Sequence, residues 1–369
     1  MEDKKKIIDL IKRKVETEYK DDVAILAVYG SYARGTHDEK SDIDLFYVPK
    51  TERANSLSFQ FIIEGIGYDL FPISFERLVR IAAFDQPLTA VITESKVLYF
   101  ATDEDLERYE SYRKSIFTML KDTDGTLMLN KSYEYFNETY IYLYNMKYEV
   151  ENLIDQCIES SKIISKIVMS VALANKTFYK GGMGTNIKDS FKLNQLPTDY
   201  KSLIDRIIGA NERDELLDSC ETLIKNTRQF LLDQRIISKE REPYNPFFVG
   251  YYEELKSVIN KMIRACEEQD QYSAFLIASY FHEEVAQFLT KAEEGIWYDD
   301  RNYYGEYSKC FDKLIGVNLM EFVTKKEFSL LKEAVLKFET NLVNLLLEKE
   351  VPMNVYDSID EFERDYKKR

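Results

Sequence analysis

One segment near the N-terminus constrains the fold and chemistry of this chain more than any other. The apolar run from Val23 to Tyr29 predicts a short buried strand, which ends at Gly30. The chain then reads SDIDL from Ser41. Because alternate side chains of a strand share one face, this second segment predicts Asp42 and Asp44 on the same face, with their Cα atoms roughly 6–7 Å apart.

The turn between these two strands has the features of a phosphate-binding site. Gly30 allows the backbone to approach a ligand closely, and Ser31 supplies a hydroxyl and an amide. A helix that begins here would direct its free N–H groups at a ligand above the turn, an arrangement that suits phosphate. We therefore predict nucleotide binding by Gly30, Ser31, Arg34 on the first turn of that helix, and Ser41.

Paired carboxylates at this spacing suit a hard divalent cation, and two such ions stabilise the attacking and leaving oxygens of an in-line phosphoryl displacement. Without a cation the two charges would repel each other. If residues 58–63 and 68–73 form a hairpin beside the Asp42 strand, Asp69 reaches the same face. We therefore predict Asp42, Asp44 and Asp69 as ligands of a divalent cation; the alternative for Asp69 is an ordinary aspartate of an edge strand.

Strand signals are confined to the first hundred residues, and the remainder has helical periodicity. The predicted strands are 23–29, 42–48, 58–63, 68–73 and 96–100. A long helical segment runs over 133–175, and Pro243 with Pro246 marks a boundary further on. We predict an α+β protein in which an α/β domain with a mixed sheet (residues 1–108) is followed by all-α helical bundles over 109–240 and 241–369.

Composition restricts the classes of binding partner and the cellular compartment that we expect for this chain. The net charge of −15 does not suit stable binding to nucleic acid, which needs clustered Lys and Arg; it is compatible with a cationic acceptor or with a role in solubility alone. The first twenty residues contain no apolar signal-peptide core, and no run of about 18 apolar residues predicts a membrane span. The four cysteines are scattered, as expected of reduced thiols, so we expect a cytoplasmic protein.

The motif GSYARG followed by SDIDL resembles the signature of the polymerase-β-like nucleotidyltransferase superfamily. In that superfamily two aspartates and a third carboxylate bind magnesium, and the Gly-Ser turn holds the triphosphate. The resemblance implies these roles for Asp42, Asp44 and Asp69, and for Gly30 and Ser31. It also implies that Mg²⁺, as one or two ions, and ATP or another nucleoside triphosphate take part in the reaction.

A narrower resemblance covers roughly Ile25 to Arg235. The stretches at 86–89, 173–179 and 196–200 are similar to parts of the aminoglycoside (kanamycin) nucleotidyltransferases. Those enzymes form homodimers with active sites at the subunit interface, so the resemblance implies a homodimer here.

The same resemblance implies that a glutamate of the helical region is the general base that takes the proton of the acceptor hydroxyl. By spacing, this role falls on Glu138, which Asn145 follows in the family pattern. Glu134, Glu149 and Glu151 are rivals, and an ordinary solvated glutamate is the alternative. Where the family has a lysine one helical turn after the base, this chain has Tyr142.

The favoured hypothesis is an enzyme that moves a nucleoside monophosphate, AMP from ATP, to a hydroxyl of a small-molecule acceptor, aminoglycoside-like and hence linked to antibiotic resistance. One alternative is a nucleotidyltransferase that modifies a protein or RNA, in the manner of antitoxins. Another is a nucleotide-binding protein without catalysis, which the presence of all three aspartates disfavours.

Overall fold

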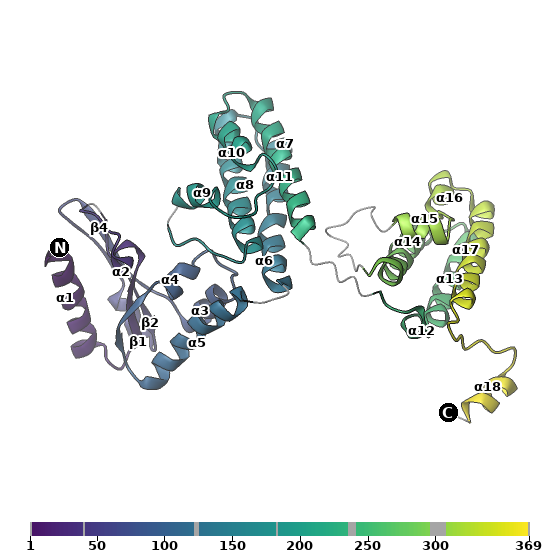
Figure 1. Ribbon diagram of the computed structural model, residues 1–369, viewed down its shortest axis with the longest axis horizontal. Coiled ribbons are helices and arrows are strands. Elements are labelled where there is room, and N and C mark those ends of the chain that lie inside the picture. The colour runs from purple at the N-terminus through teal and green to yellow at the C-terminus, as the bar shows by residue number, and fades with distance from the viewer. Residues whose placement is uncertain are drawn as a thin grey trace. The chain divides into compact units, whose positions relative to one another are not determined.

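The computed structural model describes residues 2–39, 41–121, 125–181, 184–234, 241–295 and 308–367. The chain divides into two compact units, an N-terminal unit (Met1–Ile236) and a C-terminal unit (Ile237–Arg369), which are described separately below (Figure 1). Within the described ranges, no helix combines the length and the apolar character needed to cross a membrane.

The N-terminal unit begins with a small sheet domain and continues as helices. Its strands are β1 (Val23–Tyr29), β2 (Asp44–Pro49), β3 (Phe59–Ile63), β4 (Ile66–Pro72) and β5 (Lys96–Phe100). Its helices are α1 (Glu2–Glu18), α2 (Gly30–Arg34), the 3₁₀ turn η1 (Glu52–Leu57), α3 (Phe75–Ala82), α4 (Thr89–Thr93), α5 (Asp103–Leu120), α6 (Thr126–Asn137), α7 (Thr139–Tyr148), α8 (Leu153–Ala174), α9 (Thr185–Ser190), α10 (Tyr200–Gly209) and α11 (Arg213–Gln234).

The five strands form one mixed sheet in the order β3-β4-β2-β1-β5. β1 is antiparallel to both β2 and β5, β3 and β4 form an antiparallel hairpin, and β4 is parallel to β2. The predicted mixed sheet, followed by helical structure, is confirmed.

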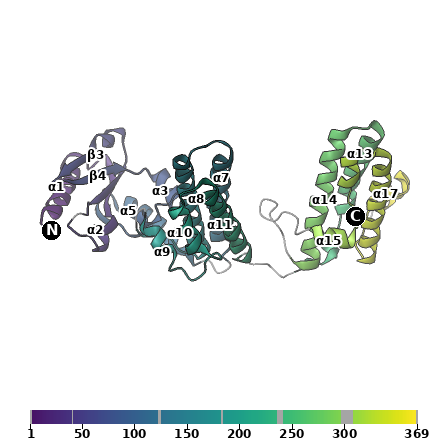
Figure 2. The same ribbon diagram turned by 90° about the horizontal axis from the view of Figure 1, so that it is seen from above.

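Each face of the sheet is covered by helices, and the alternation along β2 shows how. Leu45 and Tyr47 pack on the α1 side, in one core with Val15. Phe46 and Val48 point to the opposite side, where they join a core formed with α3, α4 and α5. Figure 2 shows α1 and α5 on either side of the strands. Strand β1 is nearly all apolar because it is central and buried on both faces.

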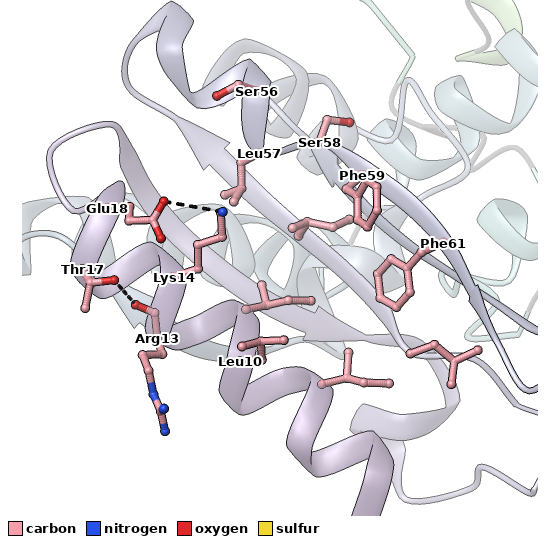
Figure 3. A pocket seen from close by; sticks show the side chains of 14 residues that line it. Leu10, Arg13, Lys14, Thr17, Glu18, Ser56, Leu57, Ser58, Phe59 and Phe61 are labelled. Atoms are coloured by element: carbon pink, nitrogen blue, oxygen red, sulfur yellow. Dashed lines mark hydrogen bonds and ion pairs between the residues drawn. The ribbon is translucent and has the colours of Figure 1, made fainter.

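An apolar groove remains open on the α1 side of the sheet, between α1 and the edge strand β3. It has a volume of about 700 Å³, and Leu10, Phe59 and Phe61 are among the side chains that line it (Figure 3).

The predicted helical segment 133–175 is divided into parts of α6, α7 and α8. α8 starts after the break because Asn152 is its N-cap: the Asn152 side chain accepts a hydrogen bond from the Asp155 amide at 2.9 Å. Glu138 is the single residue between α6 and α7. Apolar side chains of α6, α7, α8, α10 and α11 form a separate helical core.

The C-terminal unit contains helices joined by loops, and no strand, within its described residues. It contains α12 (Tyr244–Phe247), α13 (Tyr251–Glu268), α14 (Gln271–Glu294), α15 (Ser308–Leu314), α16 (Met320–Lys325), α17 (Phe328–Glu348) and α18 (Ile359–Tyr366). The rings of Phe281, Phe311 and Phe338 stack in its core. The predicted domain boundary at residue 240 lies outside the described residues.

Candidate active site

Two of the predicted carboxylates meet on neighbouring strands of the sheet. Asp44 is the first residue of β2, and its register partner on the parallel strand β4 is Asp69. Since Phe46 follows Asp44 by two residues and Phe71 follows Asp69 by two, both carboxylates lie on the face that carries α3 and α5. The β3–β4 hairpin predicted from the sequence is therefore what brings Asp69 beside Asp44.

Asp42 is not part of a strand, contrary to the prediction from the sequence. The predicted strand began at Asp42, whereas β2 begins at Asp44, so the alternation argument does not apply to Asp42. The apolar side chain between them, Ile43, is buried and anchors this segment in the α1-side core. Asp42 is exposed and Asp44 is half-buried.

The charges of these carboxylates interact. Burial, together with the negative charge of Asp42, raises the pKa of Asp44 to about 6; Arg34 opposes this rise and Asp69 adds to it. Burial and the same three carboxylates raise the pKa of Tyr29, which lies opposite Asp44 on β1. The face thus carries concentrated negative charge, and a cation bound there would relieve the repulsion.

Gly30 approaches the Asp44 carboxylate so closely that no side chain fits between them. A Cβ atom built on Gly30 would lie 1.9 Å from Asp44 Oδ2, and the φ angle of Gly30 is +73°. Glycine is therefore required at the start of α2 for both space and backbone conformation.

The other predicted nucleotide ligands differ in their surroundings. Arg34 ends α2, and it forms no ion pair with any residue in the described ranges. Ser31 is next to Gly30 on the same helix, and the structure gives its hydroxyl no partner among the described residues. Ser41 instead donates to Asp38 Oδ1 at 2.8 Å and accepts from the Asp38 amide at 2.9 Å, so its hydroxyl holds the loop that precedes β2.

The structure adds two residues that the sequence reasoning missed. Gln60 on β3 donates a hydrogen bond from Nε2 to Asp69 Oδ1 at 2.7 Å. Arg77 on α3 acts on Tyr29 electrostatically, and its Nε donates to Gln86 Oε1 at 3.1 Å. A sequence signal existed for Gln60, which is the one polar side chain in the strand sequence FQFII. No comparable pattern marks Arg77.

The carboxylate of Glu138 is paired with a lysine side chain from a neighbouring helix. Its carboxylate forms an ion pair with Lys166 Nζ of α8 at 2.5 Å. Asn145, which follows Glu138 in the family pattern, donates to Glu159 Oε2 at 3.0 Å. The ring of Tyr142 lies against the Lys162 ammonium of α8. A lysine thus accompanies Glu138, but it comes from α8 rather than from the next turn of α7.

The donor chemistry of the carboxylate face fits magnesium, which takes oxygen ligands. Within the described part of the chain, no three His, Cys, Asp or Glu side chains are grouped closely enough to form a complete metal site. This is compatible with Mg²⁺, which retains water and is commonly held by one or two carboxylates together with substrate phosphates. The pair formed by Asp44 and Asp69, with Asp42 beside it, suits that partial role.

Comparison with known families agrees with the geometry. Residues 8–159 match the model described as the nucleotidyltransferase domain, and residues 107–237 match the KNTase C-terminal domain, that of kanamycin nucleotidyltransferase. The resemblance predicted from the sequence is confirmed. No curated protein matches the chain. A nucleotidyltransferase-like protein of Exiguobacterium sibiricum, known from its crystal structure, is 10% identical with a TM-score of 0.35; the alignment covers 74% of this chain and 92% of that one.

Proposed function

We propose that this chain, in which a nucleotidyltransferase domain is followed by a KNTase C-terminal domain, transfers AMP from ATP to a hydroxyl of a small-molecule acceptor. The observation that carries the proposal is the pairing of Asp44 with Asp69 beside Gly30 at the start of α2. The acidic net charge favours a cationic acceptor of the aminoglycoside class.

In this proposal the three aspartates hold magnesium together with the triphosphate. Bound there, Mg²⁺ neutralises charge on the phosphate oxygens and helps to align them for in-line attack. Gly30 and Ser31 offer backbone and hydroxyl groups to the phosphates, and Arg34 offers a guanidinium that is not engaged in an ion pair with any described residue. Ser41 contributes by fixing the loop before β2 through Asp38.

The acceptor hydroxyl oxygen attacks the α-phosphorus, the bond from that phosphorus to the bridging oxygen breaks, and pyrophosphate leaves. The hydroxyl proton passes to a carboxylate, for which we propose Glu138. Because Glu138 is paired with Lys166, acceptance of that proton requires the acceptor to displace or share this ammonium. A cationic acceptor suits this exchange, since its own ammonium groups can replace Lys166 beside the carboxylate.

The test is a transfer assay with ATP labelled on the α-phosphate, Mg²⁺ and a panel of aminoglycosides, followed by mass spectrometry of the products. The wild-type chain is compared with the Asp42→Asn/Asp44→Asn double variant and with a sample from which Mg²⁺ has been removed by EDTA. We expect a mass gain of one AMP on the acceptor, which is lost in both controls.

The alternative outcomes are separable. Magnesium-dependent ATP binding without transfer to any aminoglycoside would reject the acceptor class but retain nucleotidyl transfer, and protein and RNA acceptors would be assayed next. Absence of magnesium-dependent ATP binding would refute the proposed function as a whole.

A further inference from the structure

The third carboxylate of the candidate site has a partner that fixes its orientation. Gln60 and Asp69 are opposite each other in the antiparallel β3–β4 pairing. The Gln60 amide donates to Asp69 Oδ1 at 2.7 Å, a favourable hydrogen-bond length. Asp69 Oδ2 forms no hydrogen bond with any described residue, and Asp69 lies on the same face of the sheet as Asp44.

The alternation of side chains along β3 explains why Gln60 faces Asp69. Phe59 and Phe61 line the apolar groove on the α1 side of the sheet (Figure 3). Side chains alternate along a strand, so Gln60 between them points to the opposite face, which carries Asp69. Gln60 is therefore directed at the carboxylates by the same alternation that directs its neighbours into the groove.

The chemistry of the amide suits an orienting role. An amide donor constrains the carboxylate without cancelling its charge, whereas Lys or Arg at this position would compete with a bound cation. Residues that hydrogen-bond to metal ligands fix their geometry in many metal sites. We propose that Gln60 is a positioning residue that presents Asp69 Oδ2 to the divalent cation accompanying the nucleotide. This inference rests on the function proposed above.

The experiment measures cation binding directly, with Mn²⁺ as a paramagnetic substitute for Mg²⁺. Electron paramagnetic resonance follows binding of Mn²⁺ to the full chain in the presence of a non-hydrolysable ATP analogue. Gln60→Met keeps the length of the side chain and removes the donor. The matched control is Ile62→Met, on the same strand and face and 76% exposed. We expect Gln60→Met to weaken Mn²⁺ binding by roughly tenfold, and Ile62→Met to leave it unchanged.

A double-mutant cycle separates orientation from a general effect on β3. In the Asp69→Asn background, Gln60→Met is expected to have no further effect on Mn²⁺ affinity, because the carboxylate that it orients is absent. Circular dichroism melting checks that all the variants remain folded. An equal loss in both backgrounds would show that Gln60 acts through the strand in general and would overturn the proposal.

The remaining outcomes separate this inference from the proposed function. If the wild-type chain binds Mn²⁺ with the nucleotide and Gln60→Met binds it equally tightly, the role of Gln60 is refuted while the proposed function stands. If the wild-type chain binds no Mn²⁺ with the nucleotide, both are refuted, because there is then no cation for Asp69 to receive.

Discussion

Asp44 on β2 and Asp69 on β4 are direct register partners on parallel strands, and their carboxylates share one face of the sheet. Like charges directly opposite each other destabilise a sheet, so this placement of the two aspartates lowers the stability of the fold. Burial, the charge of Asp42 and, to a smaller extent, the charge of Asp69 raise the pKa of Asp44 to about 6 in the chain without a cation. Such conflicts are typical of functional sites.

Asp44→Asn is expected to abolish magnesium-dependent transfer and yet to raise the thermal stability of the cation-free chain. Burial and the neighbouring charges disfavour ionised Asp44 in the folded state at pH 7.5, and the amide removes this cost. After allowance for solvent screening at a half-buried site, the gain is about 1 kcal/mol, or roughly 2–4 °C in Tm.

Calorimetry in EDTA measures this gain. The charge-matched control is Glu64→Gln in the exposed β3–β4 turn, for which we expect little change. A Tm for Asp44→Asn equal to or below that of the wild type would contradict the prediction.

Gly30→Ala is expected to remove activity through a clash with Asp44, and Gly35→Ala provides a matched comparison. Both glycines have a φ angle of +73°, so alanine costs each of them a backbone strain of about 1 kcal/mol. Only at Gly30 does the new Cβ meet Asp44 Oδ2; no atom lies within 4 Å of the Cβ built at Gly35. We expect kcat/KM to fall roughly a hundredfold for Gly30→Ala alone, because a displaced ligand misaligns the reacting groups. Similar kcat/KM values for the two variants would show that glycine is required at position 30 because of backbone strain and not because of contact with Asp44.

Glu138→Gln tests the assignment of the general base. If Glu138 takes the hydroxyl proton, kcat falls by a factor on the order of 10²–10⁴ while magnesium-dependent ATP binding is unchanged. The control is Glu134→Gln on α6, whose carboxylate pairs with Lys131. Steady-state kinetics with an acceptor identified by the transfer assay supply kcat, and calorimetric titration supplies ATP affinity. An unchanged kcat would reassign the base to another group.

The sequence was most informative where local patterns decide the structure. The hairpin signal placed Asp69 beside the strand of Asp44, because turn glycines and apolar alternation act over a few residues. The start of β2 was misplaced by two residues, at Asp42, because the end of a strand depends on which neighbouring backbone is available for pairing.

Contacts between distant segments were not predictable from a single sequence. Lys166 lies on a different helix from Glu138, and the packing of α7 against α8, which no spacing rule encodes, brings them together. Tyr142, which occupies the place of the family's lysine, likewise lies against Lys162 of α8, a contact that the sequence did not indicate. Arg77 likewise reaches the region of Tyr29 only through the placement of α3 beside the sheet.

The C-terminal unit is expected to lose stability in acid through His282. This half-buried ring lies 4.6 Å from the Phe311 ring, between centroids, and Nε2 is 3.0 Å from Ser308 Oγ. Burial lowers the pKa of His282, while Asp312 and Glu283 partly oppose the shift. The folded-state pKa therefore lies below the unfolded value of about 6.5. The stabilisation is present above that pH and is lost as the pH falls through the folded-state pKa, because the unfolded chain binds the proton first.

His282→Gln keeps a polar group near Ser308 and removes the titration. Amide hydrogen exchange of α14 peptides in the full chain gives the local unfolding free energy of each protein between pH 7.5 and 5.5. Relative to the variant, the wild type is expected to lose stability below about pH 6.5, by at most about 1.4 kcal/mol per pH unit, since one proton is involved. Parallel pH profiles for the two proteins would show that His282 titrates alike in the folded and unfolded chains, and an opposite slope would mean that Asp312 and Glu283 outweigh burial.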